Sequence, residues 1–371
     1  MGILRVYLAL CVVATHAGSV IFPWGMHDGR QAVQVFYIIS GFYMAMVLSS
    51  RYSKPCDFYV SRMMRIFPPY WITLVVTLLL CTTTGLFFHQ WLLLKPYVHA
   101  LTHNGVLGVV LSAAANLTLI GQDWIMFLSH DLGQPIHLTG NFRSDANPLW
   151  HYLIVPQCWS IGLELTFYSV APYLNRLRTR WLGVLAFSAL FARLFCYVHM
   201  EGAFDPWTYR FFPFELSLFL WGMLGYRLYL WTAPRHPSDN FRCKSGLGYF
   251  FGIILMVVLF YLQKGALDYF VRLIGYEFSI LISYMLWALI VPVLFFVFGS
   301  QRCDRVIGEL SYPIYLVHYV IIAVVGYLFY CLEITQGFGV YCAVASIVVS
   351  IVLYKFVVIP LDQKRHGLTR T

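Results

Sequence analysis

The chain has 371 residues, of which 60% are hydrophobic and only 11% are charged, and its mean hydropathy is +0.71. Soluble domains carry about 25% charged residues, so this composition excludes an ordinary soluble protein. The formal net charge of +9 does not indicate nucleic-acid binding, because the basic residues lie in short clusters between apolar runs.

The nine cysteines are scattered without a CxxC pair, and most lie inside apolar runs, as Cys81, Cys196 and Cys342 do. This pattern is typical of reduced core residues and predicts neither a disulfide framework nor a metal site. The stretch from Met1 to Phe22 lacks a small-x-small cleavage site and is followed by further apolar runs. That favours a retained first helix over a secretory signal peptide.

Windows of about 20 apolar residues predict membrane-spanning helices. The sequence contains ten confident windows of this kind. An eleventh, weaker window, 105–128, is interrupted by Asn116, Gln122 and Asp123. The predicted fold class is therefore an all-α polytopic membrane protein, with residues 1–371 forming a single membrane domain. The ten confident windows fall near 3–22, 31–50, 67–88, 150–172, 181–199, 210–231, 246–263, 275–299, 307–331 and 339–360.

The basic residues decide the predicted topology, because cytoplasmic loops are enriched in Lys and Arg. A full crossing by 105–128 would move Arg176, Arg178 and Arg180 to the outside. We therefore expect 89–148 to be an outside segment with an interfacial or re-entrant piece, and both termini to be cytoplasmic. With ten crossings the cytoplasmic loops hold fifteen of the 25 basic residues, namely Arg51, Lys54, Arg62, Arg65, Arg176, Arg178, Arg180, Arg235, Arg242, Lys244, Arg302, Arg305, Lys364, Arg365 and Arg370.

Ionisable side chains inside spans are costly, which makes them functional candidates. Arg5 and His16 are eleven residues apart, about 16 Å along a helix and within roughly 20° of one face, so both can line the same cavity. His16 can act as a general base near neutral pH, and a hydrogen-bonded structural histidine is the alternative. The six ionisable residues lying deep in spans are Arg5, His16, Glu164, Arg193, Glu215 and His318.

Glu164 belongs to a face that Ser160 and Tyr168 share, because the three residues repeat every four positions. A bare carboxylate there needs a partner, so we expect Glu164 to be paired with an arginine or a histidine or to be protonated. Tyr315 and His318 likewise share a face that begins at Ser311.

Two further segments combine polar or small residues with a predicted span. Arg62 and Arg65 stand at i and i+3 before Pro-Pro-Tyr-Trp, where paired guanidiniums can clamp a phosphate or simply anchor the cytoplasmic end. Ser40 and Gly41 form a small pair in the second span, where glycine permits close helix packing.

Taken in order, these segments resemble the membrane acyltransferase type 3 family. The resemblance covers essentially the whole chain, and five motifs in the right order and spacing carry it. They are Arg5 with ten intervening residues before His16, the segment Val35–Phe42, the Arg62 and Arg65 segment ending in Pro-Pro-Tyr-Trp, Trp159-Ser160 followed by Glu164 and Tyr168, and the segment Ser311–His318.

The resemblance implies a ten-span enzyme of the bacterial inner membrane that moves acetyl, or another short acyl group, from a cytoplasmic donor to an extracytoplasmic sugar. Its targets would be glycans such as O-antigen, exopolysaccharide, peptidoglycan or lipo-oligosaccharide, free or lipid-linked. Acetyl-CoA would be the acyl donor, with no metal, and the other partner would be the lipid bilayer.

The resemblance also assigns roles to residues. His16 would be the essential histidine, Arg5 its partner and Glu164 a third catalytic residue, whereas Arg62 and Arg65 would hold acetyl-CoA. The substrate-binding or supporting residues would be Ser40, Trp159, Tyr168, Tyr315 and His318.

Two departures from the family pattern stand out. Val358 takes the place, two residues before Pro360, where family members often carry a glutamate. The sequence also continues for only eleven residues after Pro360, so we expect a stand-alone enzyme without a fused hydrolase-like domain. A proton-coupled transporter or glycan flippase, with His16, Glu164 and His318 as a proton path, is the alternative from the residues alone.

Overall fold

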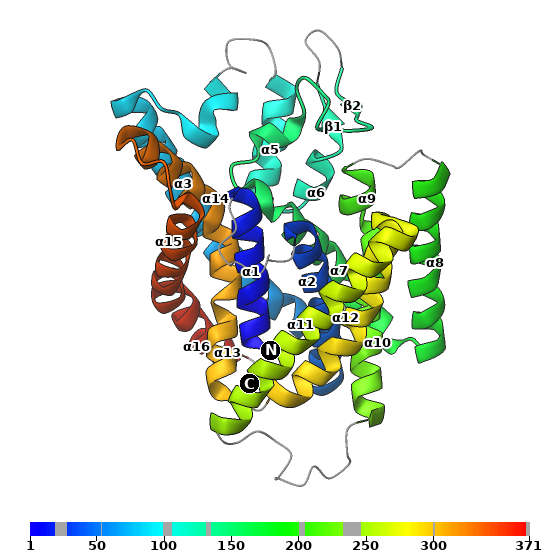
Figure 1. Ribbon diagram of the computed structural model, residues 1–371. Coiled ribbons are helices and arrows are strands. Elements are labelled where there is room, and N and C mark those ends of the chain that lie inside the picture. Colours follow the sequence, from blue (N-terminus) through cyan, green and yellow to red (C-terminus); the bar gives the residue numbers. More distant parts are fainter. Residues whose placement is uncertain are drawn as a thin grey trace.

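The computed structural model describes residues 1–18, 28–52, 54–98, 106–130, 135–199, 205–232, 246–299 and 301–368. Long helices run side by side through these residues as a bundle (Figure 1), which confirms the all-α polytopic fold. The long helices are α1 (Gly2–His16), α2 (Gly29–Ser50), α3 (Pro55–Phe88), α7 (Trp159–Arg176), α8 (Thr179–His199), α10 (Phe212–Thr232), α11 (Gly246–Ile274), α12 (Tyr276–Phe298), α14 (Ser311–Cys331) and α15 (Phe338–Leu353).

Short elements connect or extend the long helices. They gather mainly at the two ends of the bundle, with α5, α6 and the small antiparallel β1–β2 sheet at one end and α13 and α16 at the other (Figure 1). The short elements are η1 (Leu92–Leu94), α5 (Val106–Thr118), α6 (Gln122–Ile125), β1 (Leu128–Ser129), β2 (His137–Leu138), η2 (Leu149–Tyr152), η3 (Pro156–Cys158), α9 (Trp207–Arg210), α13 (Arg302–Glu309), η4 (Tyr354–Val358) and α16 (Ile359–Leu368).

Seven helical segments in the described residues are long and apolar enough to cross a membrane. They comprise α2, α3, α8, α11, α12, α13 with α14, and α15 continued through η4 into α16. The other three predicted spans correspond to α1, which has 15 residues, and to α7 and α10. The count of ten spans stays a prediction.

Helix α3 begins earlier than its predicted window at 67. It starts at Pro55, a favourable first helical residue, and continues through Pro68 and Pro69 for 34 residues in all. Arg62 and Arg65 therefore lie within a long helix and not on a loop before it.

Residues 106–125 form two short helices, and neither is a complete span. Helix α5 has 13 residues, about 20 Å of rise, against about 30 Å of bilayer core. The amide of Asn116 donates to the carbonyl of Tyr152 at 2.9 Å and accepts from the backbone of Ile154 at 3.0 Å. Gln122 donates to the hydroxyl of Tyr70 on α3 at 2.8 Å. The polar residues that interrupt the window thus dock this segment on the bundle.

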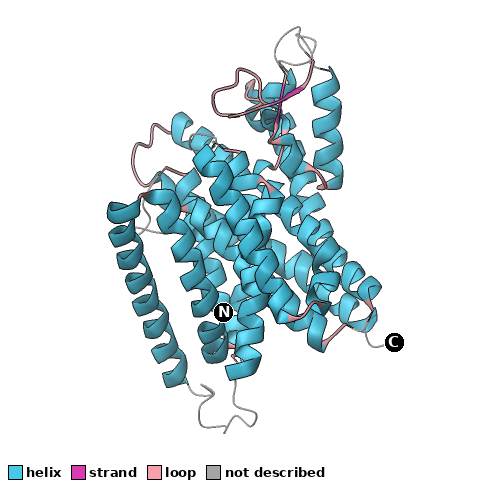
Figure 2. Cartoon of the chain, turned by 90° about the vertical axis from the view of Figure 1, so that its right-hand side faces the viewer, coloured by secondary structure: helices cyan, strands magenta, loops and turns pink. Residues whose placement is uncertain are grey.

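Met1 and helix α16 lie toward the same end of the bundle in Figure 1, and the marks for the two ends of the chain lie toward that end in Figure 2. This is the arrangement expected of an even number of crossings, and the assignment of that end to the cytoplasm stays a prediction. Of the predicted cytoplasmic residues, Arg235, Arg242, Lys244 and Arg370 lie outside the described part of the chain.

Helix α1 occupies the middle of the bundle, where it packs against α2, α13, α14 and α15. Its first backbone N–H groups have no partners within the helix, and the carboxylate of Asp304 on α13 accepts from Gly2 at 2.5 Å and from Ile3 at 3.0 Å. This contact fixes the start of α1, so that Arg5 lies one turn inside one end and His16 ends the helix at the other.

Candidate active site

Two cavities enter the bundle from its opposite ends. One, of about 980 Å³, is lined by Arg5, Arg62 and Arg65, and we call it the arginine cavity. The other, of about 770 Å³, is lined by His16 at the end of α1, and we call it the histidine cavity. Val33 on α2 and Tyr315 on α14 line both cavities, so the inner ends of the two cavities are adjacent at these side chains.

The arginine cavity has an excess of positive charge. Within it, Arg65 is paired with Glu309 at 2.7 Å, so one guanidinium is already partly neutralised. Arg62 lies over the ring of Phe58 at 5.7 Å. Arginines outnumber carboxylates among the lining residues, which include Arg5, Arg51, Arg62, Arg65, Arg302 and Arg305 against Glu164, Asp304 and Glu309. Such a cavity attracts an anionic ligand.

Glu164 lies in the arginine cavity and is held by hydroxyl groups. The side chain of Ser40 on α2 donates to one carboxylate oxygen at 2.5 Å, and Tyr168, one turn further along α7, donates to the same oxygen. Among the ion pairs of the described residues none includes Glu164, so the predicted arginine or histidine partner is not observed. The predicted shared face of Ser160, Glu164 and Tyr168 is confirmed, because all three line this cavity.

His16 is exposed to the histidine cavity, and its ring lies beside that of His318 on α14, with the centroids 5.3 Å apart. His318 is fully buried, and its Nδ1 lies 2.8 Å from the carbonyl oxygen of Tyr315. A carbonyl only accepts, so Nδ1 carries the proton and Nε2 is a bare acceptor. In the described residues that Nε2 has no hydrogen-bond partner.

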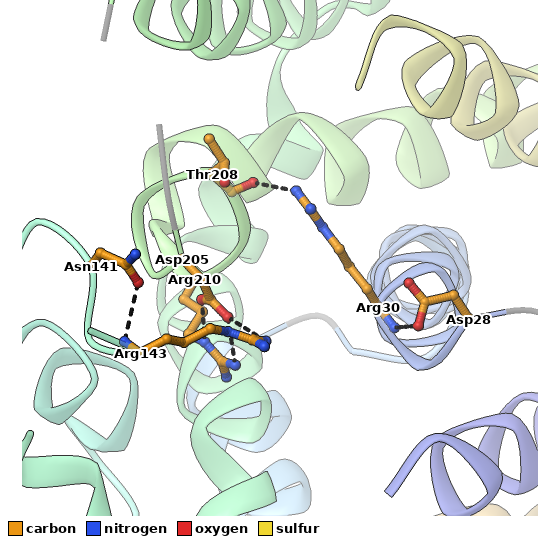
Figure 3. A network of polar contacts seen from close by, with 7 residues as sticks. All are labelled: Asp28, Arg30, Asn141, Arg143, Asp205, Thr208 and Arg210. Carbon is orange, nitrogen blue, oxygen red and sulfur yellow. Dashed lines mark hydrogen bonds and ion pairs between the residues drawn. The ribbon is translucent and has the colours of Figure 1, made fainter. Parts of the chain in front are cut away.

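An arginine and several aromatic rings also line the histidine cavity. Arg210 lies 4.0 Å from the ring centroid of Trp159 and 5.0 Å from that of Tyr209. Its Nε donates to Asp205 at 2.7 Å, and Arg143 reaches the same carboxylate at 3.3 Å (Figure 3). Both α9 and the loop around residue 143 therefore contribute to the site.

Polar atoms in the histidine cavity are left without partners. The indole nitrogen of Trp150, the amide oxygen of Gln157 and Nη1 of Arg210 are buried and have no hydrogen-bond partner within the described residues. All three residues line this cavity. Buried polar groups in folded proteins are almost always satisfied, so this cavity is suited to a polar ligand.

Tyr315 is the partition between the two cavities. Its hydroxyl lies 2.6 Å from the side-chain oxygen of Ser160 and donates to the carbonyl of Gln157 at 2.7 Å. Arg5 and His16 consequently line different cavities, which differs from the expectation that they line the same one. Their shared helix face is compatible with this, because about 16 Å of rise separates them.

Comparison with known proteins decides the family. The profile of the acyltransferase 3 family, described as an acyltransferase domain, matches residues 1–355. The chain belongs to the acyltransferase 3 family. It is similar to Nodulation protein 10 of Rhizobium leguminosarum bv. viciae, with 24% identity over 191 residues, which is 48% of this chain and 44% of that protein. The chain thus spans less than half the length of that relative, and no solved structure matches it.

The ten residues to which the resemblance assigned a role all lie at or beside the two cavities, whereas the candidates Arg193 and Glu215 line neither and pair with each other at 3.1 Å. Arg5, Ser40, Arg62, Arg65, Glu164 and Tyr168 line the arginine cavity, Tyr315 lines both, His16 and Trp159 line the histidine cavity, and His318 is buried against His16. No local pattern marks four further residues of this acyltransferase that line the histidine cavity, namely Gln157, Asp205, Tyr209 and Arg210. They belong to connecting segments that only the fold brings to the cavity.

Proposed function

We propose that this membrane acyltransferase moves an acetyl or other short acyl group from acyl-CoA in the arginine cavity to a hydroxyl of a carbohydrate in the histidine cavity. The observation that supports the proposal is that the two cavities come from opposite ends and are separated at their inner ends only by side chains that line both, those of Val33 and Tyr315. A donor and an acceptor that enter from opposite ends can therefore meet within the bundle.

The donor side matches the chemistry of coenzyme A. That molecule carries several phosphates, and guanidinium groups bind phosphate through paired, charge-assisted hydrogen bonds. Arg62 and Arg65 lie one turn apart on α3 and line the cavity together with Arg5, so they are the residues that we expect to hold the donor. The pantetheine arm with its thioester would extend toward Ser160 and Tyr315.

The acceptor side matches a sugar. Trp150 lines the histidine cavity, is half-buried and offers a ring on which a pyranose can pack, while the unpartnered atoms of Trp150 and Gln157 can bond its hydroxyls. We expect a glycan outside the cytoplasm, such as O-antigen, exopolysaccharide or a lipid-linked oligosaccharide, and a location in the bacterial inner membrane.

The transfer step uses His16 as the general base. The neutral imidazole takes the proton from a sugar hydroxyl, the hydroxyl oxygen bonds to the thioester carbonyl carbon, and the carbon–sulfur bond breaks. The leaving thiolate then takes up a proton and departs as the free thiol of coenzyme A. His318 supports His16 through its bare Nε2, which can accept a hydrogen bond from an imidazole beside it.

Mass spectrometry of the surface glycan tests this function. Deletion of the gene should remove ester-linked acyl groups from a glycan that is still exported in normal amounts, and the intact gene should restore them. Loss of export with the ester content of the remaining glycan unchanged would favour the transporter or flippase alternative and would contradict the proposal.

A further inference from the structure

The mouth of the histidine cavity carries an arginine network that the transfer step does not use. Arg30, Arg143 and Arg210 line the cavity from α2, from the loop after β2 and from α9 (Figure 3). The carboxylates that line it are Asp28 and Asp205. The three guanidiniums and two carboxylates leave an excess of one positive charge.

The network is organised around a single carboxylate. Asp205 accepts from Nε of Arg210 at 2.7 Å, from Nη2 of Arg210 at 3.2 Å and from Arg143 at 3.3 Å. One negative charge therefore serves two guanidiniums. The side chain of Arg143 is 71% exposed and that of Asp205 is 13% exposed, so the network runs from the surface into the cavity.

Arg210 is the inner member of the network. Its guanidinium is packed among the rings of Trp159, Tyr209 and Phe142, with centroid distances of 4.0, 5.0 and 5.2 Å. Asp205 occupies two of its three nitrogen positions, and the third, Nη1, has no partner in the part of the chain that the structure describes. A purely structural brace would leave a buried charged donor unsatisfied, which is costly.

These observations describe a subsite for an oxyanion above an aromatic floor. A carboxylate or phosphate carried by a sugar can bond the guanidinium donors that Asp205 leaves, while Trp159 holds the guanidinium of Arg210 in place from behind. We infer that the acceptor is an acidic carbohydrate whose carboxylate or phosphate is bound by Arg210 and Arg143. The inference rests on the proposed function, because it names the class of the acceptor in that same site.

Binding of small sugars to the purified full-length protein in detergent tests the inference without any acyl donor. Glucuronate, glucose 1-phosphate and glucose are compared by saturation-transfer NMR titration, which suits weak ligands. At least one of the two anionic sugars should bind about tenfold or more tightly than glucose. The difference should shrink at high salt, because part of the site is exposed.

Matched variants separate the subsite from general electrostatics. Arg210→Gln should abolish the preference for the anionic sugar, and Arg143→Gln should reduce it, whereas Arg272→Gln should keep it. Arg272 is an exposed arginine at the end of α11 that lines neither cavity. If Arg210→Gln does not fold, Arg143→Gln decides, because its side chain lies mostly in solvent.

The outcomes are distinct. A preference for glucuronate identifies a carboxylate, a preference for glucose 1-phosphate identifies a phosphate such as that of a lipid linker, and both support the inference. Glucose binding as tightly as both anions would overturn it, and so would a full preference for the anion in every folded variant of Arg210 and Arg143. Because this experiment measures binding and not transfer, such a failure would not contradict the proposed function. If acyl transfer itself failed, the binding result could still be interpreted.

Discussion

His16 occupies the last position of α1, where its ring faces a cavity on one side and the buried His318 on the other. We predict that His16→Gln lowers acyl transfer by a factor of about 10² to 10⁴, because an amide can replace a hydrogen bond but cannot accept a proton at neutral pH. Donor binding should be unchanged, since His16 does not line the arginine cavity. Radiolabelled acetyl transfer and coenzyme A binding, each with purified protein, measure the two effects.

The control for this prediction is His199→Gln, because His199 is exposed on α8 and lines neither cavity. Substantial transfer by a well-expressed His16→Gln protein would remove His16 from the chemistry. Loss of folded protein in His16→Ala with rescue by glutamine would instead identify a structural histidine.

The donor side gives a second prediction at the residue scale. Arg62→Gln should weaken binding of coenzyme A by about tenfold, because a charge-assisted contact to phosphate is lost, and Arg62→Lys should recover only part of it. Arg180→Gln, which removes a charge at the start of α8 outside both cavities, should bind coenzyme A normally. Isothermal titration in detergent measures these affinities, and equal binding by all the variants would reduce Arg62 to a membrane anchor.

Residue-scale prediction from the sequence succeeded where a buried polar side chain follows a helical period. Glu164 and Tyr168 are one turn apart, so their contact follows from the helix alone. Arg210 and Asp205 lie on a connecting segment and meet Arg143 only through the fold, and no local pattern marks them. The position of Tyr315 between the two cavities could likewise not be predicted from the sequence, because it depends on the contact of α14 with α7 and η3.

At the scale of elements, α2 and α10 pack through glycines. A Cβ at Gly41 would lie 1.9 Å from the carbonyl oxygen of Phe219, and one at Gly222 would lie 1.9 Å from that of Ile38. Each added Cβ would collide with a backbone atom, which cannot move away by a side-chain rotation, so the two helices would have to separate. The close packing that Ser40 and Gly41 predicted is thereby confirmed.

We therefore predict that Gly41→Ala lowers the stability of the folded protein by about 1–3 kcal/mol or more, as overpacking does. Gly183→Ala on α8 is the matched control, because a Cβ there meets no atom within 4 Å. Fluorescence-detected size-exclusion chromatography after a series of heat steps compares the two. A Gly41→Ala protein as stable as the Gly183→Ala protein would contradict the close packing of α2 against α10.

The sequence placed the long helices well and their ends less well. Apolar length is enough to find α12 and α15, whereas the start of α3 depends on Pro55 and on a helix that tolerates Pro68 and Pro69. The loop charges and the interruptions at Asn116, Gln122 and Asp123 predict that 105–128 does not cross the membrane, and the structure shows Asn116 and Gln122 bonded to polar partners in the bundle. The division of this segment into α5 and α6 depends on tertiary contacts, which the hydrophobic periodicity of the sequence does not predict.

At the scale of the whole molecule, the loop charges predict which end of the bundle is cytoplasmic. In a cysteine-free background, cysteines at Tyr52 and Arg178 should react with a membrane-impermeant maleimide only from the cytoplasmic side, and a cysteine at Arg272 only from outside. Labelling of position 178 from outside, with position 52 labelled only from inside, would mean that 105–128 crosses the membrane.

The central claim is that an acyl group passes from a donor at one end of the molecule to a carbohydrate at the other. It predicts that sealed vesicles holding the glycan acceptor in the lumen, with the cytoplasmic face of the protein outward, acylate that glycan when radiolabelled acetyl-CoA is added only to the outside. The same vesicles with His16→Gln or Arg62→Gln should leave the glycan unlabelled or weakly labelled. Label that reaches the glycan only when acetyl-CoA is sealed in the same compartment would contradict transfer between the two cavities.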